Sequence, residues 1–427
     1  MSLFVLTIYS YHENYIWNVA KNNVNLSNIL QTSKTKLDFI KWDKIQIEHD
    51  TDFIALGCLG DGIKSNPYRI ENYNLSGAIV IANTTKFFTI KNCLVSLGIY
   101  IKNVSMNTAI ITNNTCESII EGVYSNYGIY VESSVNVTIT NNFCIQNEYG
   151  IFLSSSNNCT IESNTCMENE INGIQLSNSN SSNIFSNICK NNQRGIIASF
   201  SHHCVISNNL LLGNTFSGNG FDYSNQNIIH HNFFVDNYPG FSQAYDYGEN
   251  NIWYATHTLE GNFWSDWTKN EPYLISDLTG SSDPYPFYDR DDDDLNDYEE
   301  IYLYNINPLN NDTDSDGMPD GWEVINKLLP WFSDQNLDPD SDDLRNMAEY
   351  GFGTNPHKAD TDEDGYNDGF EIKAGTNPLN KEEYPIEVTK TKEVYVSSLI
   401  ILLSILSSSI VYSRKKQKKG RIDAKQV

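Results

Sequence analysis

The sequence predicts an all-β solenoid, followed by an acidic segment with regularly spaced aspartates and by one long apolar helix. Three observations predict this organisation. A sequence motif recurs every 22 or 23 residues between about residues 90 and 235, aspartates occur at fixed spacing after residue 285, and an uncharged run lies near the C-terminus. A period of this length indicates stacked coils, and short β-branched runs separated by Asn and Gly indicate strands rather than helices.

Each repeat contains a short β-branched strand, an Asn, and a second strand that begins with Gly-Ile. Parallel stacking at about 4.8 Å places equivalent side chains in columns, with isoleucines inside and asparagines at a corner. The isoleucine column comprises Ile111, Ile139, Ile161, Ile184, Ile206 and Ile229, and the asparagine column comprises Asn114, Asn142, Asn164, Asn187, Asn209 and Asn232. We expect the repeated glycine at another corner, where positive φ causes no strain; it is Gly128, Gly150, Gly173 or Gly195 in successive coils. The repeat length predicts about eight or nine coils between Tyr68 and Trp264.

Four cysteines occupy the same phase of successive coils: Cys116, Cys144, Cys166 and Cys189. One interpretation is a buried column of small apolar thiols, because free cysteine is among the most buried residue types. One or two disulfides, or a metal ladder, are the alternatives, although parallel side-chain directions make the disulfide geometry poor.

Phrases outside the repeats carry a resemblance to a known family. Residues 66–72 and 88–93 stand before the coils, and Gly261–Trp267 stands where the coils are expected to close. Over residues 46–285 the chain resembles right-handed parallel β-helix proteins of the pectate-lyase-like type that includes the nitrous-oxide-reductase accessory protein. The resemblance implies a right-handed β-helix in an exported protein that binds or processes carbohydrate or acts as a surface scaffold. It attaches no single reaction to the chain.

The acidic segment, residues 286–385, contains four loops with oxygen-bearing side chains at positions 1, 3, 5, 9 and 12. A chain uses this spacing, with Gly at position 6, to wrap calcium. Loop 1 has Asp289, Asp291, Asp293, Asp297 and Glu300; loop 2 has Asp312, Asp314, Asp316, Asp320 and Glu323; loop 3 has Asp338, Asp340, Asp342, Asn346 and Glu349; loop 4 has Asp360, Asp362, Asp364, Asp368 and Glu371. Loops 2 and 4 have the expected glycine, whereas Asp294 and Asp343 replace it in loops 1 and 3.

Charge density supports a cation-binding role for this segment. Between Asp283 and Glu383 the chain has 28 acidic and six basic residues, which accounts for most of its net charge of −26. Such carboxylates repel one another unless cations lie among them, so we expect folding of the segment to depend on structural calcium. A solvated acidic linker is the alternative. A similar tail follows three of the loops, as Asn307-Pro308 after loop 1 and as Gly-Thr-Asn-Pro at residues 353–356 and 375–378 after loops 3 and 4. With these tails, the loops resemble thrombospondin type 3 repeats and related bacterial calcium-binding stalks.

The C-terminal part predicts a membrane anchor. Residues 394–413 form an uncharged run that is long enough to cross a bilayer, and a basic tail, residues 414–427, follows it. Because basic flanks stay in the cytoplasm, we expect a single-pass protein whose bulk lies outside the cell. Residues 1–45 are expected to form an N-terminal cap or an export region.

Catalytic candidates within the coils are few. One patch could support catalysis, and it consists of Glu168, Glu170, Lys190 and Arg194. Stray ion pairs on a solvated turn are the simpler interpretation, since a hydrolase needs two carboxylates that flank one bond. The pairs His202-His203 and His230-His231 differ in phase, so we interpret them as loop histidines rather than as a shared metal site.

Aromatic residues indicate binding more than chemistry. A cluster around two coils contains Tyr124, Tyr127, Tyr130 and Tyr149. Rigid aromatic faces suit sugar rings, and ordinary packing on the outer face is the alternative. We therefore expect a cell-surface protein that binds carbohydrate, adheres or forms a scaffold without catalysis. The alternative is a membrane-tethered polysaccharide lyase, epimerase or glycoside hydrolase. The negative charge of the chain disfavours nucleic acid as a partner, and the sequence does not indicate which protein, if any, is a partner.

Overall fold

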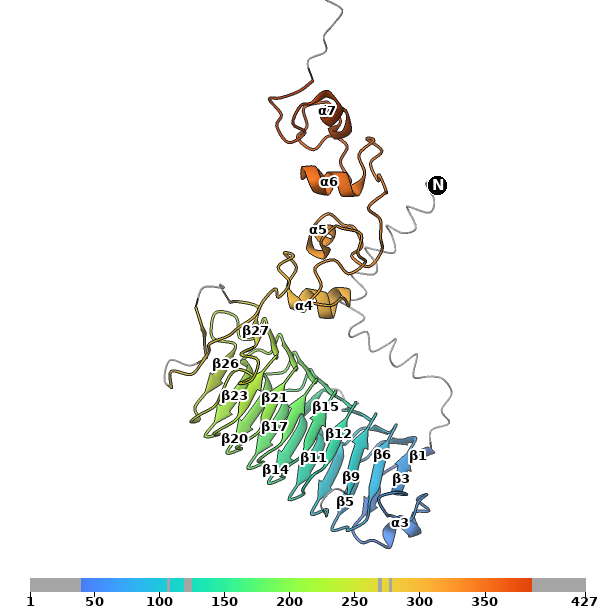
Figure 1. The fold of residues 1–427 in the computed structure, drawn as a ribbon. Helices are drawn as coiled ribbons and strands as arrows, with labels where there is room; N and C mark the ends of the chain where they lie inside the picture. Colours follow the sequence, from blue (N-terminus) through green and yellow to red (C-terminus); the bar gives the residue numbers. More distant parts are fainter. Residues whose placement is uncertain (1–39, 106–107, 119–124, 268–270, 276–278, 386–427) are drawn as a thin grey trace, which may run out of the picture. The chain divides into compact units, whose positions relative to one another are not determined.

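The computed structural model describes residues 40–105, 108–118, 125–267, 271–275 and 279–385, in two compact units (Figure 1). The first unit ends at Asn311 and the second begins at Asp312. None of the helices in these ranges is both long and apolar enough to cross a membrane. The predicted span, residues 394–413, lies outside the described residues.

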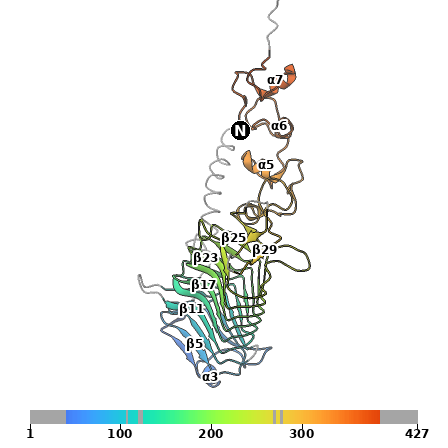
Figure 2. The same cartoon turned by 90° about the vertical axis from the view of Figure 1, so that its left-hand side faces the viewer.

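The first unit is a parallel β-solenoid with three sheets along its length (Figures 1 and 2). Sheet A contains, in order, β1 (Ile40–Trp42), β4 (Tyr73–Leu75), β7 (Leu94–Val95), β10 (Thr115–Glu117), β13 (Phe143–Ile145), β16 (Thr165–Met167), β19 (Ile188–Lys190), β22 (Leu210–Leu212), β25 (Phe233–Val235) and β27 (Phe263–Trp264). Sheet B contains β2 (Ile45–Ile47), β5 (Ile79–Ala82), β8 (Ile99–Lys102), β11 (Ser125–Glu132), β14 (Asn147–Ser154), β17 (Asn172–Ser177), β20 (Arg194–Ser199), β23 (Ser217–Asp222) and β26 (Ala244–Asp246). Sheet C contains β3 (Tyr68–Glu71), β6 (Phe88–Lys91), β9 (Ala109–Thr112), β12 (Thr138–Thr140), β15 (Thr160–Glu162), β18 (Asn183–Phe185), β21 (Val205–Ser207) and β24 (Ile228–His230). The predicted parallel β-solenoid is confirmed.

The predicted isoleucine and asparagine columns are both present and fully buried. Ile139 pairs in register with Ile111 and Ile161. In the asparagine column, the backbone N and the Nδ2 of Asn142 both donate to Asn164 Oδ1 at 2.9 Å, and Nδ2 also donates to a backbone carbonyl of the preceding coil. The same bonds recur at each rung and end on the buried carboxylate of Asp283. Each side-chain amide therefore satisfies buried backbone groups of two coils.

The repeated glycines have a different role from the predicted one. Gly173 lies inside β17 and has no positive φ; a Cβ there would lie 2.8 Å from Gly195 O and 3.0 Å from Cys189 Sγ. The left-handed corners are instead the residues before the ladder asparagines, such as Asn141 and Ser163. The expected corner was therefore wrong, because close approach of the next coil, and not φ, requires glycine at these positions.

The cysteine column lies in sheet A, with Cys144 paired to Cys116 and Cys166. All eight cysteines of the chain are free, and the four of this column have no exposed surface. Burial raises the pKa of Cys166 well above its usual range. Cys166 is therefore protonated, and the four buried side chains of the column pack as small apolar groups.

Aromatic packing extends the first unit beyond the predicted end of the solenoid at residue 285. Phe263 stacks on Tyr288 at 5.3 Å, and Phe233 contacts Phe287 and Tyr302 edge to face. Loop 1, α4 (Asp297–Glu299) and the π-helical turn η1 (Glu300–Tyr304) therefore belong to the compact unit that contains the solenoid. The short elements α3 (Asp52–Ala55), β28 (Tyr273–Leu274) and β29 (Ser282–Asp283) complete this unit.

The second unit contains loops 2, 3 and 4, each followed by a short helix. These helices are α5 (Asp320–Ile325), α6 (Asn346–Phe352) and α7 (Asp368–Ala374). Each helix begins at position 9 of its loop, so that position 12 lies in its first turn. Gly353 and Gly375 end α6 and α7 in the left-handed conformation, for which glycine is the favoured residue.

Candidate functional site

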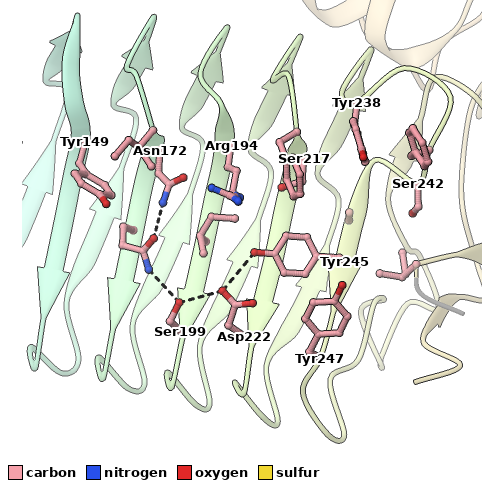
Figure 3. Close-up of a pocket in the computed structure, with 17 residues that line it drawn as sticks. Tyr149, Asn172, Arg194, Ser199, Ser217, Asp222, Tyr238, Ser242, Tyr245 and Tyr247 are labelled. Carbon is pink, nitrogen blue, oxygen red and sulfur yellow. Dashed lines mark hydrogen bonds between the residues drawn. The ribbon is translucent and has the colours of Figure 1, made fainter. Parts of the chain in front are cut away.

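A groove of about 700 Å³ lies on the outer face of sheet B, across β17, β20, β23 and β26 (Figure 3). Parallel register puts its residues in columns. One column runs Tyr127, Tyr149, Asn172, Arg194 and Ser217, and the next runs Tyr130, Phe152, Gln175, Ile197, Gly220 and Tyr245. The missing side chain of Gly220 makes room for Tyr245, because a Cβ there would lie 2.2 Å from the Cζ of the Tyr245 ring. The groove therefore forms where the second column loses its outward side chain, at Gly220.

Three consecutive rungs of the first column each present a buried polar atom without a hydrogen-bond partner. These atoms are Asn172 Oδ1, Arg194 Nε and Ser217 Oγ. All three residues line the groove, and Figure 3 shows them on neighbouring strands. Since buried polar groups are normally paired, this column is where hydrogen-bonding groups of a bound molecule would fit.

The charged groups of the groove are one arginine and one aspartate among its described lining residues. The Arg194 guanidinium carbon lies 4.5 Å from the centre of the Phe216 ring, and its Nη1 donates to Gln193 Oε1 at 2.9 Å. Asp222 Oδ2 accepts bonds from the Ser199 hydroxyl at 3.3 Å and the Tyr245 hydroxyl at 3.4 Å. Burial, and then the charge of Asp222, raises the pKa of Tyr245 far above its usual range, so its phenol stays protonated.

Aromatic rings border the groove. Phe216, Tyr238 and Phe241 form a stack with ring centres 5.1 and 4.4 Å apart, and Tyr245 lies 5.2 Å from Tyr247. Phe241 is 63% exposed and Tyr247 is 48% exposed, so both offer ring surface to a ligand.

The predicted tyrosine cluster continues this face of sheet B. Tyr127 lies 4.6 Å from Tyr130 and 5.5 Å from Tyr149 between ring centres, which confirms that these three rings gather. Tyr149 also lines the groove, whereas Tyr124 lies outside the described residues.

The structure brings only Arg194 of the four catalytic candidates into the groove. Glu168 and Glu170 are exposed, and Lys190 lies in sheet A. None of the ion pairs in the described ranges involves these four residues. Asp222 and Tyr245 were missed because they lie where the outward column stops repeating, at Gly220 and Tyr245. The sequence did contain one pattern that could have located the groove. The residue before each repeated glycine is polar in three successive coils, and these residues are Asn172, Arg194 and Ser217.

The acidic loops form a second candidate site, and all four share one backbone arrangement. The position 1 carboxylate accepts bonds from backbone N–H groups further along its own loop: Asp312 from Asp316 and Gly317, and Asp360 from Asp364 and Gly365, at 2.9 to 3.2 Å. Loops 1 and 3 make the equivalent bonds although Asp294 and Asp343, both at φ +74°, replace glycine. The carboxylates at positions 1, 3 and 5 thus converge to within 4.8 Å in every loop.

Positions 3 and 12 hold carboxylate oxygens that are buried and accept no hydrogen bond. This holds for both oxygens of Glu323, Glu349 and Asp340, and for one oxygen each of Asp314, Asp362 and Glu371. The pKa of Glu323 is raised to about 10, that of Glu349 to about 8 and that of Glu371 to about 7. Burial is the main cause in each case, and repulsion from neighbouring aspartates adds to it. Oxygen-only clusters with unpaired carboxylates fit a hard cation such as calcium.

Position 9 differs from positions 3 and 12. Both oxygens of Asp320 accept bonds from Thr313, and both oxygens of Asp368 accept bonds from Thr361, at 2.6 to 2.8 Å. Asp297 accepts bonds from Arg290 in the same way. These residues therefore close their loops against position 2, and their role as cation ligands stays a prediction.

A family model described as the periplasmic copper-binding protein (NosD) matches residues 12–269, more than half of the chain. The chain belongs to the NosD family. A model of the bacterial TSP3 repeat matches residues 360–381, which contain the whole of loop 4 together with its tail. No curated protein matches the chain. The β-helix and repeat resemblances drawn from the sequence are confirmed at this level.

Solved structures similar to this member of the NosD family include two epimerases. The A-module of the mannuronan C-5 epimerase AlgE4 from Azotobacter vinelandii is 14% identical with a TM-score of 0.36, over 44% of this chain and 60% of that chain. A double mutant of the periplasmic alginate epimerase AlgG is 13% identical with a TM-score of 0.31, over 57% and 77%. The chain thus spans less than two thirds of the AlgE4 module. At these TM-scores the likeness carries no argument about function.

The described residues do not fit the copper that the NosD description names. The stacked cysteines are fully buried, and burial raises the pKa of Cys166 well above its usual range, so its thiol is not the thiolate that binds a metal. His230 and His231 face each other with Nδ1 atoms 2.6 Å apart, and His231 Nε2 contacts Glu260 at 2.8 Å, so their nitrogens bind one another and a carboxylate. In the described ranges, every cluster of three or more potential ligands consists of carboxylates. Soft or nitrogen-rich sites suit copper, and these clusters do not.

Proposed function

We propose that this chain is an exported carbohydrate-binding protein whose sheet B groove holds a glycan without cleaving it. The observation that carries the proposal is the column of three buried, unpartnered polar atoms beside exposed aromatic rings. Sugar hydroxyls supply hydrogen-bond partners for such atoms, and the apolar faces of sugar rings pack on aromatic side chains.

The groove chemistry favours binding over catalysis. Asp222 is the one carboxylate among the described lining residues, whereas glycoside hydrolysis uses a pair that flanks the bond. Tyr245 would serve a lyase or epimerase as a base only when deprotonated, and its raised pKa keeps the proton in place. A membrane-tethered lyase, epimerase or hydrolase is therefore the second candidate, and product analysis distinguishes it.

We further propose that loops 1 to 4 bind structural calcium and that residues 394–413 anchor the chain in the membrane with its bulk outside. Unpaired carboxylates at positions 3 and 12 support the calcium assignment. The periplasmic description of the NosD family supports an outside location. The proposed partners are thus a polysaccharide or cell-surface glycan and the lipid bilayer.

Affinity electrophoresis of the full-length chain, in detergent with calcium, against a polysaccharide panel tests this proposal. We expect retardation by at least one polymer, with Tyr245→Ala reducing the affinity roughly tenfold through lost ring contact. Tyr223→Ala is the matched control, because Tyr223 is 67% exposed and lies outside the groove lining. Mass spectrometry should find each polymer intact. Shortened or unsaturated products would establish the enzyme instead, and absence of binding to every polymer would leave only a scaffold role.

A further inference from the structure

We propose that the groove selects an anionic glycan, and that a uronate carboxylate of the ligand pairs with the guanidinium of Arg194. This inference rests on the proposed glycan binding and adds the chemical class of the sugar.

Among the described residues, Arg194 has no carboxylate partner, although the chain has a net charge of −26. None of the ion pairs between described residues includes it, and its one side-chain acceptor is the neutral Gln193. Its Nε is buried without a partner. A guanidinium left unpaired at a groove is a ready partner for a carboxylate, which it binds through two parallel N–H bonds.

Contacts around Arg194 hold it ready for such a pair. The guanidinium lies over the Phe216 ring, so its faces are partly occupied, and its Nη1 donates to Gln193, which leaves its other N–H groups for a ligand. Its backbone is fixed by register between Asn172 and Ser217. Figure 3 shows its side chain between those of Asn172 and Ser217, on the side of the sheet that carries Tyr245.

The neighbouring polar groups suit the uncharged part of the same sugar. Asn172 Oδ1 accepts hydrogen bonds and Ser217 Oγ can donate or accept, and they lie one rung to either side of Arg194, about 4.8 Å away along the sheet. Asp222 lies in a different column from Arg194, since it pairs in register with Ser199, and its carboxylate accepts bonds from Ser199 and Tyr245. The column of Asn172, Arg194 and Ser217 thus offers one cation flanked by neutral groups, which is the pattern that a uronic acid residue requires.

Calorimetric titration with oligogalacturonate and with its methyl ester tests the inference. The ester has the same sugar without the negative charge. Excess calcium is present so that the acid does not remove calcium from loops 1 to 4. We expect the acid to bind roughly ten- to a hundredfold more tightly than the ester, with a lower affinity at higher salt.

Variants assign the selectivity to Arg194. Arg194→Gln should abolish the preference for the acid and Arg194→Lys should restore part of it. Lys190→Gln, which removes one positive charge outside the groove, should leave the preference unchanged. Equal affinity for acid and ester, or a preference that survives Arg194→Gln, would overturn the inference while leaving glycan binding intact. Binding of neither ligand nor of any other polymer would instead overturn the proposed function.

Discussion

The solenoid interior and the acidic loops both bury polar side chains, but the two regions differ in whether the protein itself supplies the hydrogen-bond partners of those side chains. In the asparagine ladder each buried amide bonds with the coil above and the coil below, so the protein supplies every partner. In loops 2 to 4 the buried carboxylates at positions 3 and 12 have unpaired oxygens. Unpaired buried charge is strongly unfavourable, so we expect these loops to bind a cation from outside the chain, whereas the ladder needs no such partner.

The largest effect should come from breaking the ladder. Asn164→Ala removes the acceptor of the Asn142 backbone N–H and the donor to two carbonyls, which leaves several buried groups unpaired. We expect the free energy of unfolding of the first unit to fall by roughly 3 to 5 kcal/mol in denaturant titration.

Asn183→Ala is the matched control for the ladder. Asn183 is exposed in β18, and its replacement should change the free energy of unfolding by less than about 0.5 kcal/mol. Equal losses in the two variants would show that the buried amides contribute nothing special.

A pH titration of the calcium-free protein should show the next largest effect. Glu323, Glu349 and Glu371 have folded-state pKa values of about 10, 8 and 7, above the value near 4.3 expected for an unfolded chain. Because the folded form holds these protons more tightly, stability should be greatest below about pH 4 and should fall as pH rises through 7 to 10. The melting temperature of the second unit in chelator, followed by circular dichroism, measures this. A melting temperature that rises between pH 5 and 9 in chelator would contradict these shifts.

Glu323→Gln should have opposite effects in chelator and in calcium. In chelator it removes the free-energy cost of protonating this carboxyl on folding, because the folded-state pKa of Glu323 is about 10, and it should raise the melting temperature of the second unit. In calcium it removes a ligand and should weaken binding at loop 2 roughly ten- to a hundredfold. Glu363→Gln changes an exposed carboxylate paired with Lys358 and should do neither. The same sign of effect in both conditions would exclude Glu323 as a calcium ligand.

The smallest effect concerns the repeated glycine. Gly173→Ala places a Cβ against Gly195 O and Cys189 Sγ, and it should destabilise the first unit by about 1 to 3 kcal/mol. Gly351→Ala in α6 meets no atom within 4 Å and should be neutral or slightly stabilising for the second unit. Denaturant titration of both variants checks the comparison, which fails if Gly173→Ala is silent.

Repetition explains which features the sequence predicted. Asn142 and Ile139 recur in every coil, so their columns could be read directly, and Asp312 to Glu323 matches a known loop spacing. The role of Gly173 could not be read, because the sequence shows that the residue recurs but not which atoms the next coil brings against it. The groove was missed since Gly220 and Tyr245 break the repeat, and non-repeating positions carry no periodic signal.

Scanning calorimetry of the full-length chain, with calcium and then with chelator, tests the central contrast most directly. We predict two transitions, of which the one belonging to the second unit falls by many degrees in chelator while that of the solenoid moves little. Loop 1 packs on the solenoid, so a small shift of the solenoid transition is expected. Two transitions that are unchanged in chelator would show that the buried carboxylates do not depend on a cation.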